Sequence, residues 1–504
     1  MSTLTEAVRG VLQRAVRVYA AAPEVASALR NQLDRLDEPL RVAIAGKVKA
    51  GKSTLLNGLV GELIAPTDAG ECTKVVTWYR DAPTPAVVSY PDDGPPEPLP
   101  IHRSADGLTV RLREVPAERL RKLVVDWPSQ SLREMTLIDT PGIASTSAAT
   151  SRRTLTLLTP DGDTPHDEPA EADAVVYLMR HLHVADAEFL ESFRDQGVAR
   201  ANAANTIAVV SRADEVGGGR IDAMLSARRI ARRYRSSPAL RGLCQTVLPV
   251  AGLLAATGKT LRQQEFTTLA ALAAAPRAEM DDVLLSTSRF LRSERVAALS
   301  VVSTENRHAL LARFGLYGLR LSMMHIRQGC DDATALAAEL VHGSGIGELC
   351  DVLRARFTDR RDLLKARTGL LAVERLLRTE VPGADMDAVA GLAVEVERIS
   401  SGAHEFVELR LLSALRCGEV PLPSSVSATA ERLLGGQGVS TTQRLALPAD
   451  APPQAVRREA LAELAHWRRR AENPFANRQE VRVYQAVARS CEGIVATLST
   501  LTLA

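Results

Sequence analysis

The chain has 504 residues, of which 46% are hydrophobic, 24% are charged and only 4% are aromatic, so it is long enough for two or more globular domains. A net charge of +2 gives no reason to expect a nucleic-acid partner, and no apolar run reaches the ~18 residues that a membrane-spanning helix requires. Six scattered cysteines without a C-x-x-C pair argue against a zinc site or a disulfide framework and favour reduced thiols in the cytosol.

The first predicted element is helical and covers residues 3–37. Apolar side chains recur every three or four residues from Leu4 to Val18, so they share one helix face. Because this apolar stripe precedes the first strand, its packing partner must come later in the chain. We expect that partner near the C-terminus, where five apolar or aromatic residues repeat at the same spacing: Tyr484, Val487, Cys491, Ile494 and Leu498.

A strand, a glycine-containing loop and a helix follow in that order. Val42–Ala45 fits one buried strand, and residues 46–53 match the pattern G-x-x-x-x-G-K-[ST]. Such a loop wraps phosphates with backbone N–H groups at a helix start. We predict that Lys52 contacts the β- and γ-phosphates and that Ser53 binds Mg²⁺. The residues of this loop expected to bind nucleotide are Gly46, Lys49, Ala50, Gly51, Lys52, Ser53 and Thr54.

Two β-rich segments come next, Val75–Tyr79 and Ala86–Tyr90, and the loop before them carries a candidate switch threonine. Thr73 is the residue that we expect to complete the coordination of Mg²⁺ and to place the attacking water with its backbone. Thr67 and Thr77 are its rivals in the same region.

A second nucleotide motif follows the short apolar strand Met135–Ile138. Asp139-Thr140-Pro141-Gly142 has the place in the chain that the second metal and γ-phosphate element of a P-loop enzyme takes. We expect Asp139 to hold Mg²⁺ through water and the N–H group of Gly142 to contact the γ-phosphate. The polar stretch 144–172 that comes next is predicted to be a long loop.

A third motif predicts which base is bound. Thr206–Val210 is a buried strand, and it is followed by Ser211-Arg212-Ala213-Asp214. The carboxylate of Asp214 can accept from two N–H groups of guanine that adenine does not offer in this geometry, and the stem of Arg212 would cover the base. Ser211 and Arg212 depart from the usual N/T-K-x-D form. The sequence therefore predicts GTP, with ATP as the alternative, and residues 249–252 form a candidate last base-contacting loop.

Strands and helices alternate up to about residue 255, which indicates an α/β domain with a mostly parallel sheet. From residue 258 onward the pattern is helical, and residues 346–379 fit one helix about 50 Å long. We therefore predict N-terminal helices that pack in a neck bundle (1–38), a GTPase head (39–257) and an elongated all-α neck and trunk (258–504).

Two residues bear on the rate of hydrolysis. Ile143 stands where Ras-like enzymes carry a glutamine that orients water, so the water must be placed by backbone and Thr73 or by a second molecule. Lys49 lies inside the phosphate loop. Its ammonium is a candidate for the charge that other GTPases recruit as an arginine finger or a monovalent cation, and a lysine that points to solvent is the alternative.

The segments GKVKAGKSTLLNGLVGE, APTDAGECTKVVTW, LIDTPGI and VVSRADE resemble the bacterial dynamin-like GTPases, and more narrowly the mycobacterial isoniazid-inducible (Ini) family. The resemblance covers most of the chain and is strongest over 41–215. It implies a GTPase head on a helical neck and trunk, with nucleotide roles for Lys52, Ser53, Thr73, Asp139 and Asp214. Eukaryotic dynamins usually have a cation-binding serine where this sequence has Lys49.

The same resemblance implies self-association, membrane remodelling and a link to tolerance of cell-wall drugs. It predicts a cytoplasmic protein that is peripheral at the inner face of the plasma membrane, with anionic lipids and a paralogous dynamin-like protein as candidate partners. The candidate lipid contacts are Val381–Val389 and Val420–Val426, and an ordinary turn of the bundle is the alternative for each. Two other functions stay open at this point, namely a regulatory GTPase switch that docks a protein and a P-loop ATPase that serves as a scaffold.

Overall fold

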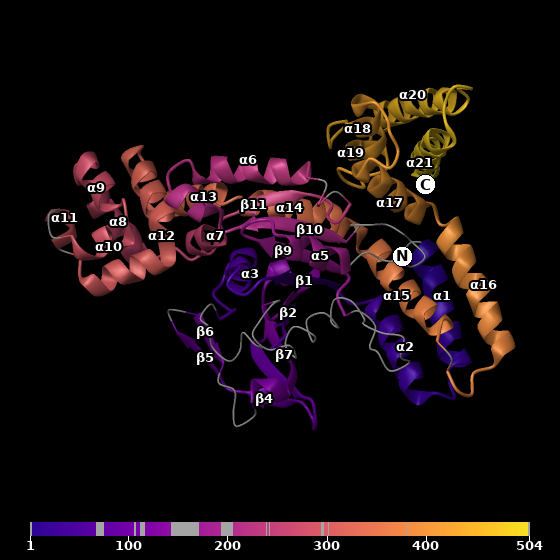
Figure 1. The fold of residues 1–504 in the computed structure, drawn as a ribbon, viewed down its shortest axis with the longest axis horizontal. Coiled ribbons are helices and arrows are strands. Elements are labelled where there is room, and N and C mark those ends of the chain that lie inside the picture. The colour runs from indigo at the N-terminus through magenta and orange to yellow at the C-terminus, as the bar shows by residue number, and fades with distance from the viewer. Residues whose placement is uncertain are drawn as a thin grey trace.

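The structure is a computed structural model, and it describes residues 3–66, 75–104, 107–110, 116–142, 171–192, 205–237, 239–240, 242–293, 297–300, 302–379 and 381–501. A nine-stranded sheet forms the centre of the molecule, and helical bodies extend from it on two opposite sides (Figure 1). The predicted architecture, a mostly parallel sheet in a head joined to a large helical region, is confirmed.

One half of the sheet is entirely parallel. Its strands lie in the order β11-β10-β9-β1-β8, so β1 is hydrogen-bonded between β9 and β8. These strands are apolar and buried almost throughout, as expected for strands covered on both faces. Their bounds are β1 Leu40–Gly46, β8 Met135–Asp139, β9 Ala174–Met179, β10 Thr206–Ser211 and β11 Val247–Val250.

The other half of the sheet is mixed and continues in the order β2-β7-β3-β4. Strand β2 runs antiparallel to β8 and parallel to β7, and β3 is antiparallel to both β7 and β4. The sequence analysis did not predict β4 or β7. The bounds are β2 Thr77–Asp81, β3 Ala86–Pro91, β4 Glu97–Leu99 and β7 Leu120–Trp127, and a separate hairpin pairs β5 Ile101–Ser104 with β6 Gly107–Val110.

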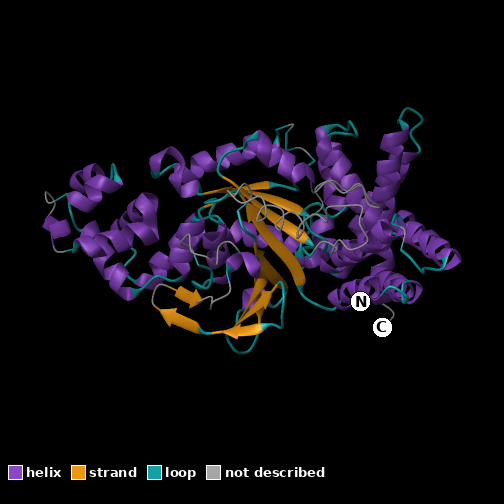
Figure 2. Ribbon diagram, turned by 60° about the horizontal axis from the view of Figure 1, so that its bottom comes forward, coloured by secondary structure: helices purple, strands orange, loops and turns teal. Residues whose placement is uncertain are grey.

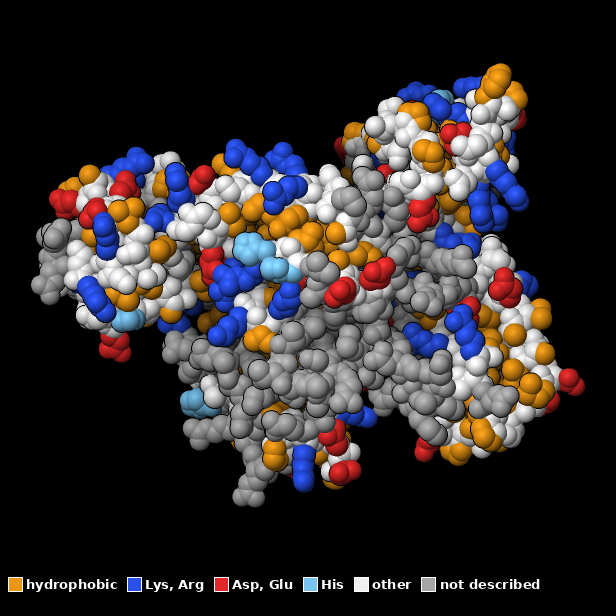
Figure 3. Space-filling model, viewed as in Figure 1, with side chains coloured by type: hydrophobic (Ala, Val, Ile, Leu, Met, Phe, Trp, Pro, Cys, Tyr) orange, Lys and Arg blue, Asp and Glu red, His pale blue; other side chains and the backbone are white. Residues whose placement is uncertain are grey.

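Helices cover both faces of the sheet (Figure 2). Helices α3, α7 and α14 share a hydrophobic core with one face, and α5 and α6 share a second core with the other. Their bounds are α3 Lys52–Val60, α5 Val184–Ser192, α6 Ala223–Arg235, α7 Gly252–Lys259 and α14 Ile346–Arg356. Helix α6 has five exposed arginines, namely Arg228, Arg229, Arg232, Arg233 and Arg235. Basic side chains are visible along this helix in Figure 3.

A helical body lies at one end of the molecule (Figure 1, left), and it shares its hydrophobic core with α6 and α7 of the head. It contains α8 Gln263–Ala273, α9 Arg277–Val283, α10 Thr287–Arg292, α11 Ala297–Ser300, α12 Thr304–Arg327 and α13 Ala333–Gly343. Helix α12 is interrupted at Gly315, where φ is 60° and ψ is 179°. The helical region after residue 258 is thus divided into two bodies by the sheet, an arrangement that the periodicity of the sequence did not reveal.

The neck bundle lies on the opposite side of the sheet. It packs α1 Thr3–Val18 and α2 Pro23–Arg35 against α15 Arg361–Leu377 and α16 Met386–Gly402. The N-terminal apolar stripe is buried, but the prediction that it covers the C-terminal seam is wrong. Its residues share a cluster with α15, α16 and the start of α17, because α15 leaves the head beside α2 and α16 returns along α1.

The C-terminal seam is buried in a separate cluster of the last five helices. Tyr484, Val487, Cys491 and Ile494 pack with residues of α17, α18 and α20. The bounds are α17 His404–Cys417, α18 Ser424–Leu433, α19 Thr441–Arg444, α20 Pro453–Ala471 and α21 Arg478–Leu501. Among the described residues, no helix combines the length and hydropathy that crossing a bilayer requires.

The single helix predicted over residues 346–379 is instead two helices joined by a 3₁₀ turn at Thr358–Arg360. Phe357 is fully buried in the core of the head, while Leu370 is buried in the neck. The apolar residues of this stripe are therefore divided between the core of the head and the core of the neck, and the chain bends between them. The periodicity did not show the bend because apolar residues are buried in both cores.

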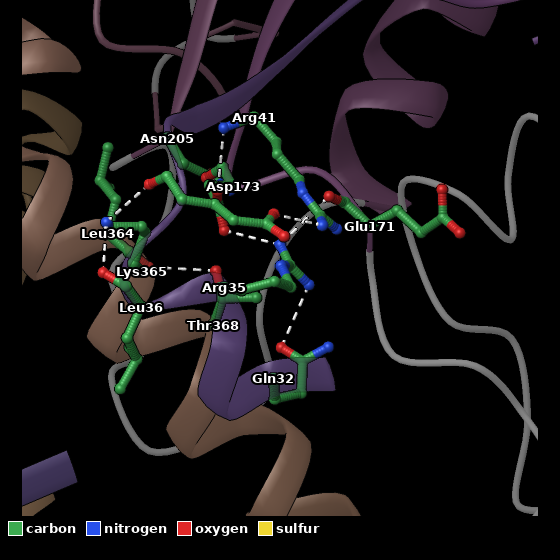
Figure 4. Close-up of polar contacts among 11 residues, drawn as sticks. Gln32, Arg35, Leu36, Arg41, Glu171, Asp173, Asn205, Leu364, Lys365 and Thr368 are labelled. Carbon is green, nitrogen blue, oxygen red and sulfur yellow. Dashed lines mark hydrogen bonds and ion pairs between the residues drawn. The ribbon is translucent and has the colours of Figure 1, made fainter. Parts of the chain in front are cut away.

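A buried polar cluster joins the neck to the head (Figure 4). The guanidinium of Arg35, at the end of α2, donates to Asp173 Oδ1 at 2.8 Å, just before β9. The other carboxylate oxygen of Asp173 accepts from the backbone N–H of Arg41 at 3.0 Å. Lys365 of α15 donates to the carbonyls of Leu36 and Glu38 at 2.6 and 2.9 Å. Two neck helices that are far apart in sequence, α2 and α15, are thus both fixed next to the linker that leads into β1.

Candidate nucleotide-binding site

The loop between β1 and α3 has a backbone that requires glycine at two positions. Gly46 has a φ of 149°, and a Cβ atom there would lie 2.5 Å from the carbonyl oxygen of Leu178. Gly51, the N-cap residue of α3, has a φ of 93°. Both angles lie outside the range that side-chain-bearing residues readily adopt. No side chain caps the N–H groups at the start of α3, so they can donate to a phosphate, as such a site requires.

Lys52 supplies a buried positive charge at the same place. Its side chain is 9% exposed, and its ammonium donates to the carbonyls of Gly46 and Lys47 at 3.1 and 3.2 Å. Burial lowers the pKa of Lys52, while the carboxylate of Asp139 acts in the opposite direction. A desolvated ammonium beside exposed N–H groups favours an anion, which agrees with the predicted phosphate contact.

Ser53 and Asp139 meet across the site. The hydroxyl of Ser53 donates to Asp139 Oδ2 at 2.6 Å, and Asp139 Oδ1 is buried without a hydrogen-bond partner among the described residues. Burial raises the pKa of Asp139, whereas Lys52 and Ser53 lower it. A hydroxyl beside an unpartnered carboxylate oxygen is a donor set that suits Mg²⁺, so the residues present fit the predicted metal.

The second motif lies directly on the phosphate loop. The hydroxyl of Thr140 donates to the carbonyl of Ile44 at 3.0 Å, which ties the end of β8 to β1. A Cβ atom on Gly142 would lie 2.5 Å from the side chain of Val48, so a larger residue at 142 would clash with the loop. Lys49 is exposed in the same loop with a φ of 61°.

The predicted switch threonine, Thr73, lies outside the described residues, as do its rival Thr67 and the rate-related Ile143. The third threonine, Thr77, is buried in β2 and donates to the carbonyl of Val75 at 3.2 Å, so its hydroxyl is already used by the sheet. Asn57 of α3 anchors the chain that leads toward Thr73, since its side chain bonds the backbone of residues 64–65 in three places.

A cavity continues from the phosphate loop toward the third motif. Its walls include Ala50, Gly51 and Thr54 on one side and the end of β10 with Ser211, Arg212 and Asp214 on the other. Val250, Gly252 and Leu253 close it, so the loop predicted as the last base-contacting element does line the cavity. The hydroxyl of Ser211 is buried without a partner among the described residues. The three motifs therefore surround one continuous site.

The sequence analysis missed the partners of two residues at this site. Arg212, which it did predict, has a φ of 51° and donates to Glu215 at 2.7 Å, which holds the guanidinium at the cavity wall. Lys47 of the phosphate loop pairs with Asp186 at 3.2 Å, and Asp186 also accepts from Tyr177 at 2.7 Å. An aspartate two residues into a helix has no motif of its own, so spacing gave no signal for it.

The comparisons with known proteins agree with this geometry. A model of the dynamin family (Dynamin_N) matches residues 42–196. Over 506 aligned residues, the chain is 41% identical to isoniazid-induced protein IniC of Mycobacterium tuberculosis, in strains CDC 1551 and H37Rv, and the alignment covers 99% of each protein. The chain belongs to the IniC family of bacterial dynamin-like proteins. The resemblance inferred from the motifs is thus confirmed, and with it a dynamin-like GTPase fold.

Two more distant matches were found, one over a short part of the chain and one of low structural similarity. A bacterial dynamin-like protein of Nostoc punctiforme is 31% identical over 119 residues, which cover 21% of this chain and 17% of that protein. A solved structure described as an oligomerised bacterial dynamin pair for long-range sensing and tethering of membranes is 14% identical, covers 86% of this chain and 78% of its own, and has a TM-score of 0.30. A likeness of this degree carries no argument about function.

The burial of the Asp214 carboxylate predicts that binding of GTP depends on pH. Burial raises the pKa of Asp214 from 3.8 to about 6. Only the ionised carboxylate accepts both N–H groups of guanine, so we expect the affinity for GTP to fall about tenfold per pH unit below pH ~6. Isothermal titration between pH 5 and 8 measures this.

The variant Asp214→Asn serves as the reference for that titration. Asp214→Asn should bind GTP more weakly than wild type at pH 8, and its affinity should change less with pH. The pH dependence that it keeps comes only from the phosphates of GTP and from the other groups of the site. A wild-type affinity that follows the same profile as Asp214→Asn would contradict the assignment of the base contact.

Proposed function

We propose that this protein hydrolyses GTP to GDP and phosphate in a Mg²⁺-dependent reaction and uses this cycle to bind and remodel membranes. The observation that supports hydrolysis is the meeting of Lys52, Ser53 and Asp139 at one glycine-bounded loop, in a member of a GTPase family. Ser53 and Asp139 are the residues that would hold the metal, which neutralises charge on the phosphates when it is bound. Thr73 and Gly142 are proposed to place the water and the γ-phosphate.

The proposed choice of guanine rests on Asp214 in the cavity beyond the phosphate loop. Its carboxylate is 7% exposed, and the neighbouring Ser211 offers an unpartnered hydroxyl. A buried carboxylate binds a ligand that donates two N–H groups more tightly than a ligand that leaves the carboxylate without a hydrogen-bond donor. GTP meets this condition and ATP does not.

The membrane part of the proposal rests on family membership and on the helical bodies that flank the head. The M. tuberculosis relatives are named isoniazid-induced, which supports a link to tolerance of cell-wall drugs. We place the protein peripherally at the inner face of the plasma membrane, with fission-type remodelling, self-association through the heads and trunk, and a paralogous dynamin-like protein as a further candidate partner.

One experiment separates this proposal from the alternatives. Hydrolysis of GTP and ATP is measured with and without vesicles of phosphatidylglycerol and phosphatidylcholine, and the vesicles are imaged by electron microscopy. We expect the protein to hydrolyse GTP but not ATP, vesicles to increase the rate of GTP hydrolysis, and the vesicles to change shape. GTP turnover with unaltered vesicles would favour a regulatory switch that docks a protein, and equal turnover of both nucleotides would favour an ATPase scaffold.

Lys49 makes a specific prediction about cations. If its exposed ammonium supplies the catalytic charge, replacing K⁺ with Na⁺ should leave the rate of GTP turnover unchanged within about twofold, and Lys49→Ala should lower that rate by about tenfold or more. Phosphate release in matched KCl and NaCl buffers measures both effects. Loss of turnover in NaCl would show instead that a bound potassium ion supplies the charge.

A further inference from the structure

The turn between α20 and α21 carries the most exposed large hydrophobic side chain among the described residues. Phe475 is 93% exposed, although burying a phenyl ring is one of the largest single gains available to a folded chain. It lies at the free end of a two-helix hairpin, where Figure 3 shows hydrophobic atoms beside Lys and Arg side chains. An aromatic ring at a protruding end, rather than in a groove, can insert into a deformable surface such as a lipid layer.

The turn holds this ring outward in an ordered conformation. Asn473 Oδ1 accepts from the backbone N–H of Phe475 at 3.1 Å, and Asn477 Oδ1 accepts from the N–H groups of Gln479 and Glu480 at 2.9 Å. Glu480 in turn accepts from the N–H of Asn477 at 2.9 Å. The backbone on both sides of Phe475 is therefore fixed by side-chain caps, so little backbone entropy remains to be lost when a partner buries the ring.

The base of the hairpin is equally well packed. Trp467 and Tyr484 have ring centroids 5.6 Å apart, and the guanidinium of Arg470 lies 5.8 Å from the first ring and 5.9 Å from the second. Trp467 also donates to Glu463 at 3.0 Å. The turn is thus a rigid end on a stable stem, so its exposed ring is not the product of a poorly packed region.

Positive charge surrounds the ring. Residues 468–482 contain five arginines and two glutamates, so their net charge is +3. Arg468 pairs with Glu492 at 2.6 Å, whereas Arg469, Arg478 and Arg482 are exposed and have no ion pair among the described residues. Guanidinium groups beside a protruding aromatic ring complement a surface that is anionic outside and apolar within.

We propose that the α20–α21 turn, residues 468–482, is the membrane contact of this protein and that it takes an anionic phospholipid surface. The ring of Phe475 enters the acyl region while Arg469, Arg478 and Arg482 contact the headgroups. This inference rests on the proposed membrane function and assigns its contact to a turn that the sequence analysis did not consider.

The two turns predicted from sequence are poorer contacts. Val420 is buried in the C-terminal cluster, and Leu422 and Val426 pack on it, so that turn belongs to the bundle. In the other turn, Met386 is 75% exposed but lies between Asp385 and Asp387, whose charges an anionic surface repels. Met386 is therefore a matched control, being an exposed hydrophobic residue at another protruding end.

The test is co-sedimentation of the full chain with phosphatidylglycerol–phosphatidylcholine vesicles and with pure phosphatidylcholine vesicles. We expect Phe475→Ser to weaken binding to the anionic vesicles by about tenfold or more. The double variant Arg469→Gln/Arg478→Gln should weaken it by about tenfold at low salt. Met386→Ser and the double variant Arg229→Gln/Arg233→Gln on α6 should bind within about twofold of wild type. GTP turnover without vesicles should be unchanged in every variant.

A direct readout is the fluorescence of Phe475→Trp in vesicles that contain brominated acyl chains. We expect the tryptophan fluorescence of Phe475→Trp to be quenched more than that of wild type. The fluorescence of Met386→Trp should be quenched no more than that of wild type. If Phe475→Ser bound the anionic vesicles as tightly as wild type does, or if only the Met386 or α6 variants lost binding, the assignment of this turn would be overturned. The proposed membrane function would still stand. A wild-type chain that binds no vesicles in any nucleotide state would overturn both.

Discussion

Lys52→Ala is expected to abolish measurable GTP binding while leaving the fold intact. Each hydrogen bond to a charged partner contributes about 1.5–3 kcal/mol, so the loss of contacts to two phosphates corresponds to a decrease in affinity of about two to four orders of magnitude. The same ammonium is buried in the free protein, where burial lowers its pKa. Removing it should therefore not lower the melting temperature without nucleotide.

Thermal melting with and without GTP and Mg²⁺ separates binding from folding. A ligand at 100 times its Kd stabilises the folded state by about 2.7 kcal/mol, so wild type should melt at a higher temperature when GTP is added and Lys52→Ala should not. Lys49→Ala is the matched control, because it removes an exposed side chain of the same loop but keeps the backbone N–H group of residue 49, through which this residue is expected to bind the nucleotide. The GTP-dependent shift should therefore be preserved. A GTP-dependent shift of wild-type size in Lys52→Ala would contradict the phosphate assignment.

Local chemistry explains what the sequence could predict about the site. The residues from Gly46 to Thr54 are contiguous, and the glycines at 46 and 51 are required by backbone angles that no neighbour can alter. Asp139 is the last residue of β8 and Asp214 follows β10, two strands of the parallel half of the sheet, so their carboxyl ends meet at one edge. Motifs of this kind determine both their own conformation and their place in the fold.

Long-range packing explains what the sequence could not predict. The N-terminal apolar stripe required a partner, but amphipathic periodicity does not distinguish α15 and α16 from α21. The bend at Phe357 left no break in the apolar pattern, because the head and the neck each bury part of it. The exposed Phe475 has no periodic signal at all, since its role would lie in a contact outside the chain.

The joint between neck and head is the other place where a single change should have a large effect. Asp173→Ala leaves the guanidinium of Arg35 without its carboxylate partner in a position where the two side chains are 5% and 1% exposed. It also removes the acceptor of the Arg41 N–H group. Breaking a buried ion pair from one side costs about 3–5 kcal/mol, so we expect a decrease of that size in the free energy of unfolding, measured by urea denaturation.

The double variant Arg35→Met/Asp173→Leu tests whether the loss comes from a buried guanidinium that no longer faces the carboxylate of Asp173. Replacing both partners of a buried pair by apolar residues is often neutral, so this variant should recover most of the stability that Asp173→Ala loses. Asp37→Ala is the exposed comparison, since Asp37 pairs with Arg9 at 2.6 Å but is 63% exposed, so the solvent screens this pair and its loss should lower the free energy of unfolding far less. Equal losses for Asp173→Ala and Asp37→Ala would mean that the joint is held by the apolar contacts of α1, α2 and α15 rather than by its buried charges. Recovery in the double variant would instead show that Arg35 and Asp173 act as one unit, which ties the N-terminal helices to the strand beside β1.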